Sequence, residues 1–256
     1  MLYSKLPIIF LSTLASEKDG STNSIIAEFI LNHLDDMASI GICDLAKQCH
    51  VAISSISRFC KEIGLQDYNE LKTLLTLPEL YYEPYSLIDN TQERMNAYVN
   101  KMKECMDQVL CSIDSNKIRQ LCLDIQFYKK VAIFGLMKAG SVALNLQCDL
   151  LMLKKVTYTK LSYKQQMEYL KNASEEDLII IFSYTGTYFD YEFRRLPKIL
   201  NRPKIYCIGG NRVENTNDVE LEYITFDSMQ DQASHPYQLQ CVASLIAQEY
   251  DYLNKD

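Results

Sequence analysis

Apolar residues recur at helical spacing along the first part of the chain. Ile25, Ile26, Phe29, Ile30 and Leu34 fall on one face of a helix predicted over residues 23–34. Further helices are predicted over 39–50, 51–63 and 68–77. The pattern stops between Pro78 and Pro84, because proline cannot continue a helix. We therefore expect an all-α domain over residues 1–77 and a linker over 78–90.

The pattern changes character after the linker. Two more helices are expected over 91–111 and 114–126, and short apolar runs then alternate with helical stretches. The strands are predicted over 131–134, 156–159, 178–183, 205–209 and 221–226, and the helices over 138–153, 164–171, 189–200 and 236–253. Strands that alternate with helices indicate a parallel sheet covered on both faces. Residues 91–256 should thus form an α/β domain.

The first residues allow two interpretations. Lys5 followed by the apolar stretch 6–15 is similar to a secretory signal peptide. The same stretch also fits a first helix that packs on the α-helical domain, and this interpretation is preferred because the rest of the chain has the features of an intracellular protein.

Composition narrows the function classes. A hydrophobic content of 48% and a charged content of 23% over 256 residues are ordinary for a folded soluble protein. The longest apolar runs, such as 178–182, are too short to span a bilayer. The net charge of -7 argues against non-specific nucleic-acid binding by the whole chain, although a small DNA-reading domain on an acidic body remains open.

Neither the cysteines nor the histidines form a chemical motif. The 9 cysteines are odd in number and contain no C-x-x-C pair, which indicates reduced thiols in the cytoplasm. His33, His50 and His235 lie far apart and outside any ligand-spaced cluster. We predict no metal and no cofactor.

Residues 44–64 have the pattern of two short helices joined by a tight turn. His50 falls in the turn, where a left-handed backbone is often needed. The second helix has one apolar face, and its opposite face carries short hydroxyls and cations, which suit bases and phosphates in a major groove. The candidate DNA-binding residues are Ser54, Ser55, Ser57, Arg58 and Lys61. An ordinary helical hairpin with a solvated polar face would show the same pattern.

Two strand-to-helix turns of the α/β domain carry candidate ligand groups. They cover residues 134–141 and 181–188. In the second turn Ser183, Thr185 and Thr187 surround Gly186, and hydroxyls beside a helix N-terminus suit a phosphate. A polar capping turn is the alternative interpretation.

The helical pair resembles the N-terminal helix-turn-helix of the RpiR/MurR family of bacterial regulators. The resemblance covers about residues 23 to 75 and is carried mainly by the stretch 56–65, which reads Ile-Ser-Arg-Phe-Cys-Lys-Glu-Ile-Gly-Leu. Tyr68-Asn-Glu-Leu-Lys72 follows it. Two positions depart from the family pattern: His50 stands where glycine is usual, and Ala52 stands where a serine N-cap is usual.

The second part of the chain resembles a sugar isomerase (SIS) domain, from about Val131 to Leu253. Ser183-Tyr-Thr-Gly-Thr187 is similar to the phosphate loop of that domain. The resemblance implies a ligand site at Gly135, Ser141, Ser183, Tyr184, Thr185, Gly186 and Thr187.

The first turn of this SIS-like domain departs from the family pattern. Met137 replaces a glycine that is usual in the family, and Ala139 replaces a serine. Lys138 could serve as a phosphate-binding charge or be a solvated lysine. His235 is expected to be structural or at the surface.

Together the two resemblances imply a bacterial DNA-binding transcriptional regulator of sugar metabolism that senses a phosphorylated sugar. Homodimers or tetramers are expected, because one acidic head would bind DNA feebly. The apolar face of 91–111, with Met95, Tyr98, Val99 and Met102, fits either the domain's own core or a dimer contact, and the core is preferred. Two alternatives remain: a degenerate SIS domain used only for dimerisation, and a sugar-phosphate isomerase.

Overall fold

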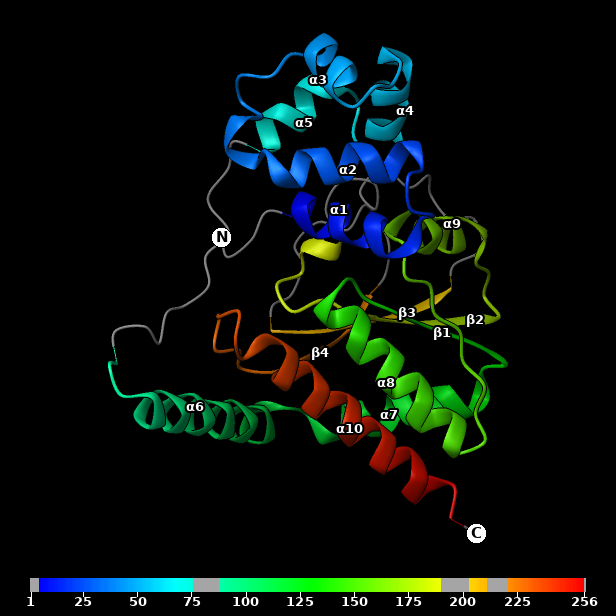
Figure 1. The fold of residues 1–256 in the computed structure, drawn as a ribbon. Coiled ribbons are helices and arrows are strands. Elements are labelled where there is room, and N and C mark those ends of the chain that lie inside the picture. The colour runs from blue at the N-terminus through cyan, green and yellow to red at the C-terminus, as the bar shows by residue number, and fades with distance from the viewer. Residues whose placement is uncertain (1–4, 76–87, 190–202, 211–220, 256) are drawn as a thin grey trace.

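The computed structural model describes residues 5–75, 88–189, 203–210 and 221–255. A group of short helices lies on one side of a parallel sheet, and longer helices lie on the other side (Figure 1). We call residues 5–75 the head and the described residues from 88 onward the body. This arrangement confirms the predicted combination of a helical N-terminal region and an α/β region.

The head consists of short helices around a shared apolar core. Its elements are α1 (Lys5–Ser16), α2 (Thr22–Asn32), the 3-10 helix η1 (Leu34–Asp36), α3 (Ile42–Gln48), α4 (Ile53–Glu62) and α5 (Tyr68–Leu75). The stretch 6–15 is therefore a helix, as preferred, and Leu6, Ile9 and Phe10 of α1 are at most 1% exposed. Ser21 caps α2, because its side chain accepts a hydrogen bond from the backbone N–H of Ser24 at 3.2 Å.

The turn between α3 and α4 has the backbone that its sequence predicts. His50 has a φ of 53°, in the left-handed region. The Val51 N–H donates to the Ala46 carbonyl at 2.9 Å and closes the turn. Ala52 then occupies the N-cap position before α4, with an extended backbone and no side-chain capping bond. Gly64, with a φ of 88°, follows α4 in the conformation typical of a helix end.

The sheet of the body is fully parallel. Its order is β1 (Lys130–Phe134), β2 (Asp177–Phe182), β3 (Lys204–Gly209) and β4 (Leu221–Thr225). The strand predicted over 156–159 is wrong in extent, since only Tyr158 forms a parallel bridge, to Ala132 at the edge of the sheet. Val156 and Tyr158 are more than half exposed, so little burial holds this segment in longer pairing.

Helices cover both faces of the sheet. The helices α7 (Ser115–Phe127), α8 (Lys138–Met152) and α10 (His235–Leu253) pack on the face that carries Val131 and Ile133. The opposite face, with Ala132 and Phe134, packs against α9 (Tyr163–Asn172). This alternation follows from the two-residue period of a strand, and burial on both faces accounts for the continuous apolar runs 131–134, 178–182 and 205–208.

The first helix of the body is only partly buried. The helix α6 (Thr91–Ser112) extends to one side of the body (Figure 1). Met102 is buried in it, but Met95 and Val99 are 57% and 48% exposed. The prediction that this face of α6 packs in the core is therefore right for Met102 and wrong for Met95 and Val99. The reason is that α10 packs against only part of α6.

The head and the body share one apolar core. Phe10 and Phe59 of the head belong to the same buried cluster as Tyr163 and Met167 of α9. The Ser12 hydroxyl donates to the Leu161 carbonyl at 2.8 Å, which joins α1 to the body. Figure 1 shows α1 between α2 and the sheet. The head is thus seated on the α9 face of the sheet.

Some predictions lie outside the described residues. These are nearly all of the helix expected over 189–200 and most of the linker over 78–90. Because the linker is not described, the domain limits of 1–77 and 91–256 stay a prediction. No helix within the described part of the chain is long and apolar enough to cross a membrane.

Candidate functional site

A cavity of about 380 Å³ opens at the carboxyl ends of β1 and β2. Both turns singled out in the sequence line it, with Lys138 and Ser141 from the first and Thr185 and Thr187 from the second. The carboxyl edge of a parallel sheet is the usual place for a ligand, and the volume suits a small molecule. The structure therefore brings the two predicted loops together in one site.

The second turn presents two hydroxyls to this cavity. The Oγ1 atoms of Thr185 and Thr187 lie 3.1 Å apart. Ser183 is buried, and its hydroxyl accepts the backbone N–H of Tyr188 at 3.2 Å, which fixes the turn. Gly186 has a φ of 81°, so a side chain there would strain the backbone. Of the predicted phosphate-binding hydroxyls, Thr185 and Thr187 are the better placed, and Ser183 shapes the loop.

The first turn brings the N-terminus of α8 to the cavity. A Cβ atom on Gly135 would meet the backbone carbon and oxygen of Ala139 at 2.6 Å, so only glycine permits this close approach. Met137 precedes the helix with a φ of 50° and a ψ of -109°, a conformation that costs a non-glycine residue energy. Met137 therefore has the backbone conformation of a glycine, the residue that is usual at this position of the family pattern. Ser141 lies in the first turn of α8 and donates to the Met137 carbonyl at 3.3 Å.

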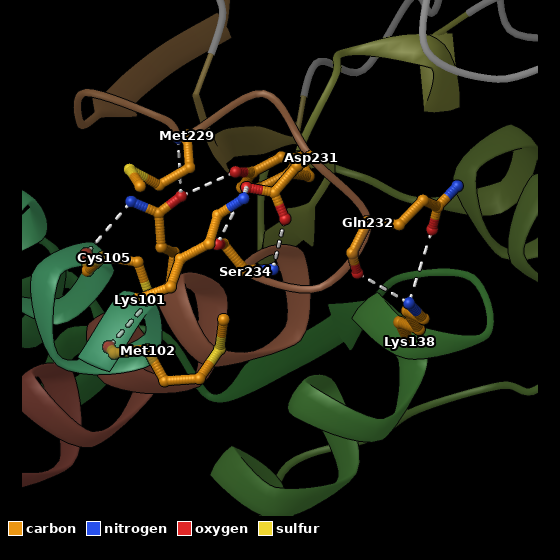
Figure 2. A network of polar contacts seen from close by, with 10 residues as sticks. Lys101, Met102, Cys105, Lys138, Met229, Asp231, Gln232 and Ser234 are labelled. Atoms are coloured by element: carbon orange, nitrogen blue, oxygen red, sulfur yellow. Dashed lines mark hydrogen bonds and ion pairs between the residues drawn. The ribbon is translucent and has the colours of Figure 1, made fainter. Parts of the chain in front are cut away.

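Lys138 joins the first turn to Gln232, which also lines the cavity. Its ammonium donates to the Gln232 carbonyl at 2.8 Å and contacts the Gln232 side-chain oxygen at 3.3 Å (Figure 2). Burial lowers the pKa of Lys138, and the charge of Asp231 opposes this effect. The Lys138 ammonium is thus bound to Gln232 rather than paired with a carboxylate. Its charge lies at the N-terminus of α8, where an anion would be stabilised.

Tyr184 of the second turn stacks on His235 at the start of α10. Their ring centroids are 4.4 Å apart with an angle of 16° between the planes. The Tyr184 hydroxyl donates to the Gln238 side-chain oxygen at 2.6 Å, so it is engaged inside the protein. Burial raises the pKa of Tyr184 to about 12. Burial, reinforced by Lys138, lowers the pKa of His235 to about 3, and the imidazole is neutral. Both residues support the loop.

A buried polar network, which the sequence analysis missed, links this loop to α6. The Gln238 amide donates to the carbonyls of Cys105 at 3.1 Å and Asp227 at 3.0 Å. Asp231 forms an ion pair with Lys101 at 3.2 Å and accepts the Ser234 N–H at 2.7 Å (Figure 2). The available signal was a glutamine on the apolar face of the last helix, next to Leu239 and Val242. A buried amide of this kind needs partners, which predicts a network.

The predicted DNA-binding residues gather on the outer side of α4. Ser54, Arg58 and Lys61 are exposed, whereas Ser55 and Ser57 are partly buried. The apolar side of the helix, with Ile56, Phe59 and Cys60, is buried in the head. The exposed side therefore carries two cations and a hydroxyl within about two turns of the helix.

The N-terminal region matches the family model described as "Helix-turn-helix domain, rpiR family" over residues 10–78. An HTH-type transcriptional regulator from Providencia stuartii is 22% identical over 188 residues, which are 69% of this chain and 67% of that protein. The HTH-type transcriptional regulator HexR of Escherichia coli K12 is 25% identical over 167 residues, 63% of this chain and 57% of HexR. The chain thus spans between about half and two thirds of these relatives.

Two solved structures have a similar fold. Vibrio vulnificus NanR complexed with ManNAc-6P has a TM-score of 0.50 at 12% identity, over 97% of this chain and 91% of that chain. The Escherichia coli CFT073 protein c3406 has a TM-score of 0.50 at 15% identity, over 64% of this chain and 93% of that chain. The first likeness spans both the head and the body.

Proposed function

We propose that this chain is a bacterial regulator that binds operator DNA through α4, because residues 10–78 match the helix-turn-helix model of the rpiR family. We propose further that its body binds a phosphorylated sugar and acts as the sensor. The regulator works in the cytoplasm as a dimer or a higher assembly, because a single acidic head offers few cations to DNA.

The cavity between the two turns is the observation that supports the sensor. It combines two threonine hydroxyls, the N-terminus of α8 and the nearby ammonium of Lys138, all of which favour an anionic group. The NanR structure of similar fold is a complex with ManNAc-6P, which is consistent with a phosphorylated ligand here.

Binding fits this site better than turnover does. An isomerase needs a general base in its pocket, usually a carboxylate or a histidine. Among the described residues that line the cavity there is no carboxylate, and the pKa of about 3 makes His235 a weak proton acceptor. The relatives that match the chain are named as transcriptional regulators.

The proposal is tested by thermal shift of the full chain against a panel of sugar phosphates, each paired with its unphosphorylated sugar. We expect a concentration-dependent rise in Tm with at least one sugar phosphate and none with its parent sugar, because a ligand stabilises the state that binds it. Thr185→Val should remove the rise. Thr73→Val, on the exposed side of α5, is the matched control and should keep it.

The strained Met137 favours a second function for the body. Its side chain lines the cavity where the family pattern has a glycine, which leaves less room for a ligand. In that case the body serves only to hold two heads together. A flat Tm across the whole panel, with DNA binding intact, would support this dimerisation role and contradict the sensor.

A further inference from the structure

The ligand cavity has a wall that comes from the head. Ile8 and Leu11 of α1 line the same cavity as Thr185, Thr187 and Lys138. They are three residues apart and therefore lie on one face of α1. This face is apolar, and it forms part of the cavity lining.

Another face of α1 is buried in the core that the head shares with the body. Leu6, Ile9 and Phe10 are at most 1% exposed. Phe10 stacks on Phe59 of α4, with ring centroids 6.0 Å apart and 27° between the planes. A single helix therefore contacts the cavity on one face and the DNA-reading helix on another.

A second contact joins the head to the body at the end of α4. Glu62, its last residue, forms an ion pair with Lys164 of α9 at 3.1 Å and accepts the Asn23 amide at 2.8 Å. Burial would raise the pKa of Glu62, but the bonds from Asn23 and Lys164 outweigh it and hold the pKa below its usual value. Glu62 stays charged, and α4 has fixed points both at Phe59 and at its C-terminus.

We propose that α1 is part of the ligand site and transmits occupancy of the cavity to α4. This inference rests on the proposed function, in which a sugar phosphate fills the cavity. The phosphate would lie at the two threonines, and the remainder of the ligand would press on Ile8 and Leu11. Since the packed residues around the cavity leave no other room, a group larger than its empty space displaces α1 and, through Phe10, the helix α4. Ligand and DNA affinities are then linked reciprocally.

The test fills the cavity with a large side chain in place of a ligand. Ser141 lines the cavity from α8, so Ser141→Trp places a bulky group in the cavity without changing the head. Asn145→Trp, one turn farther along α8, is exposed and outside the cavity lining, and serves as the matched control. Hydrogen exchange of the full chain is measured for residues 5–16 and 53–62. We expect at least fivefold faster exchange in both segments for Ser141→Trp and less than twofold change for Asn145→Trp.

A double variant decides whether the effect passes through α1. Leu11→Ala removes the atoms that the new tryptophan would press on, so Ser141→Trp/Leu11→Ala should return exchange in 53–62 to within twofold of the Leu11→Ala value. Should Ser141→Trp fail to fold, Ser141→Leu fills the cavity with a smaller group. Unchanged exchange in α1 for a folded filled variant, or a double variant as perturbed as the single one, would overturn the inference.

The outcome separates this inference from the proposed function. Suppose that no sugar phosphate raises the Tm of the wild-type chain, but that Ser141→Trp still speeds hydrogen exchange in α1 and α4. The proposed sensor function is then contradicted, whereas the proposed role of α1 is supported. If sugar phosphates bind and the filled cavity leaves both helices unchanged, the sensor stands and the role of α1 falls.

Discussion

The backbone of Met137 is strained because the residues around it fix the shape of the turn. The close approach of Gly135 to Ala139 fixes the turn, and Met137 must then adopt a φ of 50° to begin α8. Such a backbone costs a non-glycine residue about 1–3 kcal/mol. The side chain also occupies part of the cavity wall, so strain and ligand space are linked at this position.

Met137→Gly should therefore stabilise the protein. Relief of the strain exceeds the entropic cost of a glycine, about 0.5–1 kcal/mol, and leaves a net gain of about 1 kcal/mol in the free energy of unfolding. Urea denaturation measures the change. Met137→Ala removes the side chain but keeps the strained backbone, so a gain of equal size in that variant would contradict the explanation.

His235 should make the protein sensitive to mild acid. Its pKa is about 3 in the folded chain against 6.5 as the ordinary value, so the unfolded chain binds a proton between these pH values and the folded chain does not. Stability is therefore lost as the pH falls below about 6.5, by about 2 kcal/mol between pH 7 and pH 5. His235→Phe keeps an aromatic ring against Tyr184 and should lose about 2 kcal/mol less over that interval. Equal pH profiles of the two proteins would sink the prediction.

Among the elements, α4 has an incomplete N-terminus. Ala52 holds the cap position with an extended backbone and no side-chain acceptor, whereas Ser21, Asn90 and Asp114 cap α2, α6 and α7. Because an N-cap hydroxyl satisfies a free N–H, Ala52→Ser should raise the free energy of unfolding by about 1 kcal/mol. Chemical denaturation tests this, with Ala52→Val, which offers no acceptor, as the control expected to give no gain.

The exposed side of α4 should bind phosphates with Lys61. A duplex enriched from a random-sequence pool on the wild-type chain serves as the probe. Lys61→Ala should weaken binding and reduce the slope of log affinity against log salt concentration by about 1, because one phosphate contact is lost. Lys103→Ala removes the same charge from the exposed side of α6 and should change neither quantity. An unaltered salt slope for Lys61→Ala would place the DNA contact elsewhere.

The sequence predicts elements well where a regular pattern extends over them. The stripe from Ile25 to Leu34 predicts α2 to within two residues, and the apolar run 178–182 predicts β2. The segment 156–159 has the same β-type composition, but its pairing depends on burial that only the finished sheet decides. Local patterns therefore predict the existence of elements better than their pairing.

The site is predictable only in its local parts. His50 and Met137 stand at glycine positions of the family patterns, and both have the positive φ that this implies. The apolar wall formed by Ile8 and Leu11 comes from a segment more than 100 residues away from the two turns, and the Cys105 carbonyl that accepts from Gln238 is equally distant from Gln238. No periodicity in the sequence indicates contacts at such separation, because the fold alone brings these residues together.

At the scale of the whole molecule, one buried cluster unites the head with the body. Phe10 is fully buried in that cluster, so Phe10→Ala should lower the free energy of unfolding by about 3–5 kcal/mol. Hydrogen exchange should rise in peptides of α4 and of α9 alike. Leu110→Ala, at a side chain that is 67% exposed on α6, should change stability by less than about 0.5 kcal/mol. A response confined to the head would show that the two parts unfold separately.

The bond between Ser12 and Leu161 joins residues that are 149 positions apart. At synthesis rates of about 5–20 residues per second, the ribosome makes α1 roughly 7 to 30 seconds before the strand-flanking segment that receives it. During that interval Ile8 and Leu11 have no body to pack against, and the head leaves the ribosome with an uncovered apolar face. The order of translation therefore leaves this apolar face of the nascent head exposed to water until the segment around Leu161 has been made.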